Sequence, residues 1–148
     1  MLPQSSLLDG LQVLIVDSDP DSASLLALIF EQDGVEILVA ASANEAIDIL
    51  QQNKPDLLIS ELRLPGEDGY SLIRKVKAIE LERKIQLPAI ALTTSTSDRD
   101  RDDALAAGFC KYLSKPFNID ELIESANNVF RQSQSLNQGD YHYFCLAG

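Results

Sequence analysis

Short apolar runs alternate with segments of helical periodicity, and this alternation constrains the fold more than any other feature of the chain. The expected strands are residues 11–16, 35–41, 56–60, 87–92 and 109–113. Residues 11–16 are apolar at nearly every position, which is typical of a strand buried on both faces of a parallel sheet. The sequence therefore predicts a parallel sheet with helices packed on both faces.

Capping signals mark the helices between these strands. Asp19 followed by Pro20 is typical of a helix N-terminus, and Gly34 is typical of the end of that helix. Two further pairs have the spacing of a capping box: Ser42 with Glu45, and Asn118 with Glu121. The expected helices are residues 22–32, a segment after residue 42, a segment from about residue 70, residues 98–107 and a segment after residue 118.

Five strand–helix units in this order leave few topologies, because crossovers between parallel strands are right-handed. We expect an α/β fold of the flavodoxin-like kind, in which a doubly wound five-stranded parallel sheet has the order 2-1-3-4-5. A chain of 148 residues suits one such domain. The expected parts are an N-terminal extension at residues 1–10, the domain at 11–131 and a C-terminal tail at 132–148.

The tail begins with polar residues typical of a flexible linker and ends with aromatic and apolar ones, among them Tyr141, Tyr143 and Phe144. Two interpretations stay open. The tail is either a disordered or packed terminus of the domain, or a short segment that docks on a partner or on a second copy of the chain.

The charge of the chain disfavours some classes of partner. Twelve Lys and Arg stand against 23 Asp and Glu, a net charge of −11. Sequence-independent binding to nucleic acid or to an anionic membrane depends on basic patches, so we expect neither partner. No apolar run has membrane-spanning length, and no signal peptide is recognisable. The two cysteines, Cys110 and Cys145, predict neither a zinc site nor a disulfide framework, and we expect a cytoplasmic protein.

Ligands of doubly wound sheets bind beyond the carboxyl ends of the strands. The predicted fold brings Asp17, Glu61, Thr93 and Lys115 to this edge of the sheet. Neighbouring carboxylates attract a divalent cation or a basic side chain, and a lysine with a hydroxyl suits a phosphoryl group. The residues therefore predict a site for a hard cation and a phosphoryl group. It lacks a His, Cys or Ser nucleophile, and we expect no enzyme.

Four motifs in order and in spacing carry a family resemblance: VLIVDSDP at 13–20, PDLLISELRLPGEDG at 55–69, PAIALTTSTS at 88–97 and YLSKPF at 112–117. Over residues 11–131 the chain resembles the receiver domain of two-component response regulators. In that family an acidic pair after the first strand and an aspartate after the third hold Mg²⁺. That aspartate accepts a phosphoryl group from a histidine kinase.

By position, the resemblance places Glu61 at the phosphoacceptor site. It assigns metal binding to Asp17, Glu61 and the backbone carbonyl of Arg63, with Ser18 or Asp19 in the place of the second acidic residue. The Arg63 guanidinium has two open interpretations. It is either solvated or folded over the carboxylates in place of a missing cation.

The resemblance also assigns contacts with the phosphoryl group to Thr93 and Lys115, and it implies a cis bond between Lys115 and Pro116. Tyr112, three residues before the lysine, takes the position of a switch residue that reports the state of the site. A packed aromatic residue is the alternative for Tyr112. The output or dimer surface would be formed by the fourth helix, the fifth strand and the fifth helix.

Two positions depart from the family pattern, and both lie at the centre of the chemistry. Glu61 carries its carboxylate one methylene further from the backbone than an aspartate, and a displacement of ~1 Å can cost roughly 100-fold in rate. Ser18 replaces an acidic residue, so we predict that any Mg²⁺ binding is weak. Glu61 has three open interpretations: a phosphomimic paired with Lys115, a decayed site, or a slow acceptor.

We therefore predict a pseudo-receiver, a stand-alone signalling module of a two-component phosphorelay whose phosphorylation is impaired or absent. It would act by contacts with a histidine kinase or a downstream signalling protein, and it could form a homodimer through the output surface. The alternative is a phosphorylation-competent single-domain response regulator that passes a phosphoryl group in a relay. A nucleotide-binding protein is disfavoured, because residues 16–22 contain no glycine for a phosphate loop.

Overall fold

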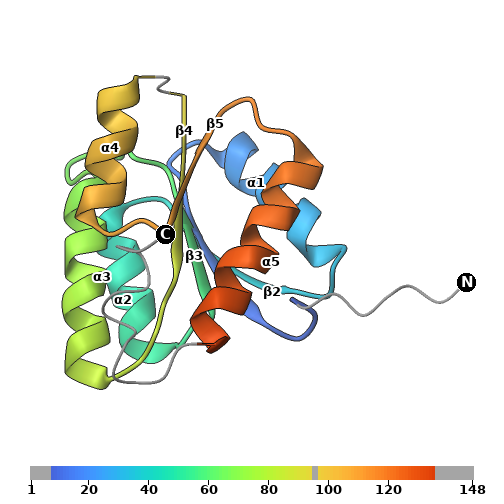
Figure 1. The fold of residues 1–148 in the computed structure, drawn as a ribbon, viewed down its shortest axis with the longest axis horizontal. Coiled ribbons are helices and arrows are strands. Elements are labelled where there is room, and N and C mark those ends of the chain that lie inside the picture. Colours follow the sequence, from blue (N-terminus) through green and yellow to red (C-terminus); the bar gives the residue numbers. More distant parts are fainter. Residues whose placement is uncertain (1–7, 95–96, 136–148) are drawn as a thin grey trace, which may run out of the picture.

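The computed structural model describes residues 8–94 and 97–135 of the chain. Its sheet contains five parallel strands in the order β2-β1-β3-β4-β5 (Figure 1), which confirms the predicted topology. The strands are β1 (Gln12–Val16), β2 (Glu36–Ala40), β3 (Leu57–Ser60), β4 (Ala89–Thr93) and β5 (Lys111–Ser114).

Helices cover both faces of the sheet, as the alternating sequence predicts. They are α1 (Pro20–Glu31), α2 (Ala43–Gln52), α3 (Gly69–Arg83), α4 (Asp98–Ala107) and α5 (Ile119–Ser135). Helices α1 and α5 lie on one face, and α2, α3 and α4 lie on the other (Figure 1). The predicted caps are present, since Asp19 caps α1, Ser42 caps α2, and the Asn118 side chain accepts a hydrogen bond from the Glu121 amide.

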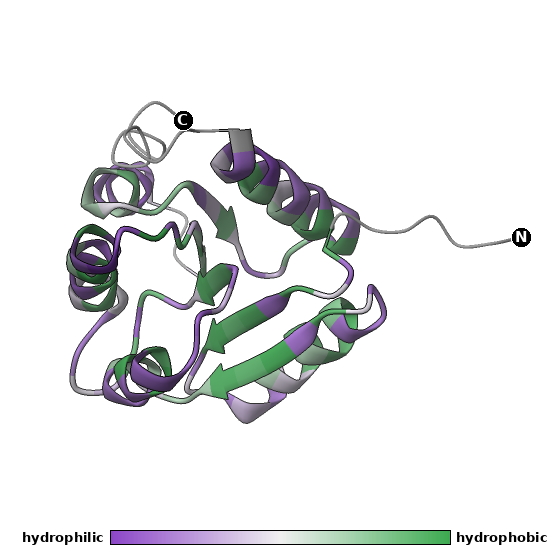
Figure 2. Cartoon of the chain, turned by 90° about the horizontal axis from the view of Figure 1, so that it is seen from below, coloured by the Kyte–Doolittle hydropathy of each residue, from purple (hydrophilic) through white to green (hydrophobic). Residues whose placement is uncertain are grey.

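Each face of the sheet has its own apolar core. One core contains Ile15 and Phe30, and the other contains Leu14 and Phe109. Neighbouring strand residues point to opposite faces, which explains why the strands are apolar at nearly every position. Figure 2 shows apolar residues along the strands and polar residues on the outer sides of the helices. Leu8, in the predicted N-terminal extension, is fully buried in the first core.

The last two strands begin two residues later than predicted. The amide of Leu87 donates to a carboxylate oxygen of Glu80 at 2.6 Å, and Pro88 has no amide hydrogen, so neither residue starts β4. The amide of Phe109 donates to the carbonyl of Ala104 in α4 at 3.1 Å, so Phe109 ends the helical segment and does not start β5. Both shifts result from hydrogen bonds that local periodicity cannot show.

The last helix extends beyond the expected end of the domain. Helix α5 continues to Ser135, four residues past the position expected for the end of the domain. The predicted docking or linker segment at 136–148 lies outside the described residues.

Cys110 is disulfide-bonded, so the prediction of no disulfide is wrong at this residue, because cysteine spacing alone does not show which thiols meet. Within residues 8–94 and 97–135, no helix is long and apolar enough to cross a membrane.

Two leucines of α1 test the first core. Leu26 is 1% exposed and Leu28 is 56% exposed. We expect Leu26→Ala to lower the free energy of unfolding by about 3 kcal/mol, because the substitution leaves a cavity in a packed core. Leu28→Ala on the same helix is the matched control and should cost less than about 0.5 kcal/mol. Urea denaturation measures both values, and similar losses in the two variants would contradict this assignment of the core.

Candidate functional site

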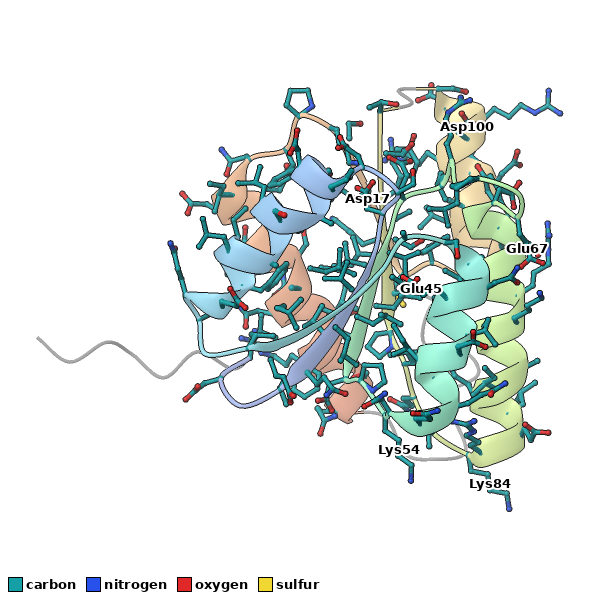
Figure 3. The ribbon with its side chains drawn as sticks, turned by 180° about the vertical axis from the view of Figure 1, so that it is seen from behind. Asp17, Glu45, Lys54, Glu67, Lys84 and Asp100 are labelled. Atoms are coloured by element: carbon teal, nitrogen blue, oxygen red, sulfur yellow. The ribbon has the colours of Figure 1, made fainter. Side chains whose placement is uncertain are left out.

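The fold brings the predicted strand-end residues together at the carboxyl edge of the sheet. Asp17 follows β1, Glu61 follows β3, Thr93 ends β4 and Lys115 follows β5. The Lys115 Nζ lies 2.7 Å from Asp17 Oδ2 and 3.0 Å from Glu61 Oε1. Figure 3 shows Asp17 at the end of β1, where the neighbouring strands also end. One ammonium group therefore bridges two carboxylates that are far apart in the sequence.

This cluster is largely shielded from water. The side chains of Asp17 and Glu61 are 4% and 9% exposed, and that of Lys115 is 15% exposed. Burial alone would lower the pKa of the Lys115 ammonium, but its hydrogen bonds to Asp17 and Glu61 outweigh burial and raise the pKa above the ordinary value. The lysine is therefore charged at neutral pH, and it neutralises one of the two negative charges.

The second oxygen of Glu61 turns back onto its own backbone. Oε2 accepts hydrogen bonds from the amides of Leu62 at 2.7 Å and of Arg63 at 3.2 Å. With Lys115 on Oε1, both oxygens of the carboxylate have donors. Glu61 is thus fixed in a conformation in which it organises the start of the loop between β3 and α3.

Both carboxylate oxygens of Asp17 also accept hydrogen bonds, and the residues that follow do not replace the missing second carboxylate. Asp17 Oδ1 accepts a hydrogen bond from the Asp19 amide at 2.9 Å. Asp19 Oδ1 accepts one from the Asp21 amide at 3.1 Å and caps α1. Ser18 is exposed and carries no charge. The Asp19 carboxylate is therefore committed to the helix, as its place before Pro20 predicted.

These contacts bear on the predicted Mg²⁺ site. Asp17, Glu61 and the Arg63 carbonyl supply the oxygen donors that a hard cation prefers. Every carboxylate oxygen of the pair already accepts an amide or ammonium hydrogen. In the part of the chain that the structure describes, no group of three or more His, Cys, Asp or Glu side chains is arranged to hold a metal ion. The donor set thus fits a divalent cation only if the Lys115 ammonium withdraws.

Thr93 and Tyr112 lie beside this cluster on neighbouring strands. Thr93 is fully buried, and its carbonyl accepts the Lys115 amide at 2.7 Å, which fixes the backbone that carries the lysine. Tyr112 is half-buried opposite Ala91 of β4 and borders a groove of about 410 Å³ along α4 and β5. The bond between Lys115 and Pro116 is cis, as the resemblance implied.

Arg63 does not stand over the carboxylates. Its side chain is 73% exposed, and its Nη2 lies 4.0 Å from an Asp100 carboxylate oxygen on α4. The solvated interpretation of the guanidinium is therefore the correct one, and the interpretation as a substitute cation is wrong. The backbone of Arg63 is held by Glu61, which leaves the long side chain free to extend toward α4.

Two residues of this region were missed by the sequence analysis. The Tyr70 hydroxyl donates to the Asp100 carbonyl at 3.2 Å, and both residues line a cavity of about 320 Å³ that also touches Thr93. Burial, followed by the nearby Asp100 and Asp103 carboxylates, raises the pKa of Tyr70 above its ordinary value. The available signal was a phenol at an inward position of a helix, since a buried tyrosine hydroxyl usually finds a partner.

A 2-1-3-4-5 sheet with carboxylates after β1 and β3 and a lysine after β5 defines the class of receiver domains. Residues 13–127 match the family model described as response regulator receiver domain, and the chain belongs to this family. It is therefore a receiver domain of a response regulator in two-component signalling. Receiver domains are signalling modules that interact with histidine kinases and other signalling partners, and they bind Mg²⁺ in the active site.

Two relatives are similar over much of the chain. An uncharacterized 14.6 kDa protein of Leptolyngbya boryana is 42% identical over 113 residues, which cover 76% of this chain and 85% of that protein. The transcriptional regulatory protein TrcR of Mycobacterium tuberculosis is 31% identical over 139 residues, which cover 93% of this chain. The match spans only 52% of the length of TrcR.

A solved receiver domain is similar in structure. The receiver domain of the sensor histidine kinase PA1611 from Pseudomonas aeruginosa PAO1 superposes with a TM-score of 0.73 and is 30% identical, over 82% of this chain and 98% of that one. It has a magnesium ion coordinated in the active site cleft.

The bridging lysine gives a direct prediction. We expect Lys115→Met to lower the free energy of unfolding by about 3 kcal/mol, because it leaves two shielded carboxylates facing each other without a cation. Millimolar Mg²⁺ should recover part of this loss, since a ligand that binds only the folded state stabilises it. Urea denaturation with and without Mg²⁺ measures both effects. Lys111→Met, an exposed position on β5, is the control, and equal losses in the two variants would contradict the bridge.

Tyr70 gives a pH-dependent prediction. Its raised pKa means that the folded state holds the phenolic proton more tightly than the unfolded state does. Tyrosinate absorbance is titrated with alkali in the wild type and in Tyr70→Phe, and the second curve is subtracted from the first. The difference curve, which reports Tyr70, should have its midpoint above about pH 10. The wild type should also lose stability relative to Tyr70→Phe as the pH rises through this value. A midpoint at or below 10 would show that the phenol is not buried against the carboxylates.

Proposed function

We propose that this chain is a pseudo-receiver, which signals by protein contacts and does not depend on phosphorylation of its acceptor position. The observation that carries the proposal is the bridge from Lys115 to Asp17 and Glu61, at 2.7 and 3.0 Å. The resemblance assigns this lysine to the phosphoryl group and these carboxylates to the metal. In this chain the three side chains satisfy one another.

The composition of the site supports the same proposal. Glu61 has one methylene more than the aspartate of the family pattern, and its Oε2 is held by two backbone amides. A nucleophile needs a freely oriented lone pair, and a small misplacement of the reacting atom is costly in rate. Ser18 supplies no carboxylate for Mg²⁺, and Asp19 is used as a helix cap. Mg²⁺ binding would accordingly be weak.

In this proposal, Glu61 is a phosphomimic whose carboxylate lies where a phosphoryl oxygen would lie, and Lys115 pairs with it. Thr93 and Tyr112 would rest in the arrangement that a partner recognises. The partner would be a histidine kinase or a downstream signalling protein, or a second copy that binds across α4, β5 and α5. The chain would be a cytoplasmic protein without enzymatic turnover, and its net charge of −11 disfavours nucleic acid and anionic membranes.

Labelling with a small phosphodonor tests the proposal. The wild type, incubated with the phosphodonor and Mg²⁺, should show no added phosphoryl group by intact mass, because its acceptor is misplaced and its metal site is incomplete. The matched control is the double variant Glu61→Asp with Ser18→Asp, which restores both carboxylates of the family pattern. We expect this variant to gain one phosphoryl group that is lost on treatment with hydroxylamine.

Each outcome decides between the two candidate functions. If the wild type gains no phosphoryl group and the double variant gains one, the result supports the pseudo-receiver. Rapid stoichiometric labelling of the wild type at Glu61 would refute it and would favour a phosphorylation-competent regulator in a relay. Labelling of Glu61→Asp alone would show that the length of the acceptor, and not the missing metal ligand, silences the site.

A further inference from the structure

Tyr70 connects the first turn of α3 to the first turn of α4. Its hydroxyl donates to the carbonyl of Asp100, the third residue of α4, at 3.2 Å. The ring borders a cavity of about 320 Å³ and a second cavity of about 460 Å³. The hydrogen bond therefore links the first turn of α3 directly to the backbone of the first turn of α4.

Tyr70 is in turn held close to Glu61 by the glycine that precedes it. The Gly69 amide donates to the Leu62 carbonyl at 2.8 Å. A Cβ at residue 69 would lie 2.7 Å from the Glu61 carbonyl oxygen and 2.9 Å from the Leu62 Cα, which only glycine avoids. The start of α3 is thus packed directly on the backbone that follows β3.

The side chain of Glu61 fixes this same backbone. Its Oε2 accepts the amides of Leu62 and Arg63, so the conformation of the carboxylate and that of the loop are linked. A continuous series of contacts therefore runs from the Glu61 carboxylate to Leu62, then to Gly69 and Tyr70, and finally to the α4 backbone. Such a series of contacts transmits a change only if its residues are energetically coupled. Comparing single and double variants measures this coupling.

We propose that Tyr70 is a positioning residue that couples the state of the Glu61 carboxylate to the position of α4. This route differs from the one that the resemblance assigns to Thr93 and Tyr112. It goes beyond the proposed function, because it concerns the geometry of the unmodified chain and holds whether or not Glu61 accepts a phosphoryl group.

The coupling would act on a surface that a partner can read. Helix α4 borders the groove of about 410 Å³ whose lining includes Arg101 of α4 and Tyr112 of β5. When the first turn of α4 shifts, the distance between these two elements changes, and with it the shape of the groove. The groove is lined by Tyr112 and not by Tyr70, so in this proposal Tyr70 acts on the surface through the backbone of α4.

The pair of Arg63 with Asp100 does not account for the coupling. Its charged atoms are 4.0 Å apart, and the side chains are 73% and 33% exposed, so the pair is weak in water. The Tyr70 bond goes to the backbone carbonyl, which remains when the Asp100 side chain is removed. Asp100→Ala therefore separates the two contacts, because it deletes the ion pair and keeps the acceptor of the hydroxyl.

Hydrogen exchange of the full chain, read by mass spectrometry on peptides from α4, tests the proposal at neutral pH. The variants are Tyr70→Phe, Glu61→Gln and the two combined, with Asp100→Ala and Tyr112→Phe for comparison. Tyr70→Phe should raise exchange in the first turns of α4 about fivefold, the factor expected for the loss of one ordinary hydrogen bond. Glu61→Gln should also raise it, but it should add nothing in the Tyr70→Phe background.

Peptides from α1, on the opposite face of the sheet, are the internal reference, and unchanged exchange there shows that the variants are folded. Unaltered exchange of α4 in Tyr70→Phe would overturn the proposal. So would a Glu61→Gln effect that persists in full without the Tyr70 hydroxyl. If the Glu61→Gln effect disappears in Tyr112→Phe and not in Tyr70→Phe, the signal travels through β5 and the inference is wrong. Asp100→Ala should change exchange by less than twofold.

Discussion

The ammonium of Lys115 lies between two carboxylates, and the arrangement of the site depends on this contact. Asp17 and Glu61 are 5% and 8% exposed as whole residues, so their mutual repulsion is poorly screened. They come from adjacent strands β1 and β3, whereas the lysine comes from the edge strand β5 and reaches across the end of β4. The 2-1-3-4-5 order is therefore a requirement of the site as well as of the core. The backbone bond from Lys115 to Thr93 fixes where the long side chain starts.

The sequence predicted what depends on periodicity and on strand ends. Apolar strands and capping residues are local signals, and a parallel sheet places all its carboxyl ends at one edge, so the meeting of Asp17, Glu61 and Lys115 followed from topology. The sequence could not show contacts between elements that no spacing rule links. The shifted start of β4 depends on the Glu80 carboxylate of α3, and the bond of Tyr70 depends on how α4 packs.

The two departures from the family pattern are physically consistent with each other. Removing a carboxylate at Ser18 lowers the negative charge that a divalent cation would offset, and a single ammonium then leaves only one net negative charge between Asp17 and Glu61. The longer Glu61 side chain reaches both Lys115 and the amides of the following loop. In this structure the carboxylate oxygens of Asp17 and Glu61 are satisfied by Lys115 and by backbone amides of the chain itself.

A glutamate that is held at both oxygens also changes how the site can communicate with the surface. In a site that waits for a phosphoryl group, the signal is the arrival of new charge, and the hydroxyl and the lysine respond to it. In the proposed pseudo-receiver the charge is part of the chain, so the signal would be a change in what the Glu61 carboxylate contacts. Its Oε1 contacts Lys115 after β5, and its Oε2 contacts the loop that leads to α3. Any partner that draws Lys115 away would alter both contacts, and the loop side leads to α4 through Gly69 and Tyr70.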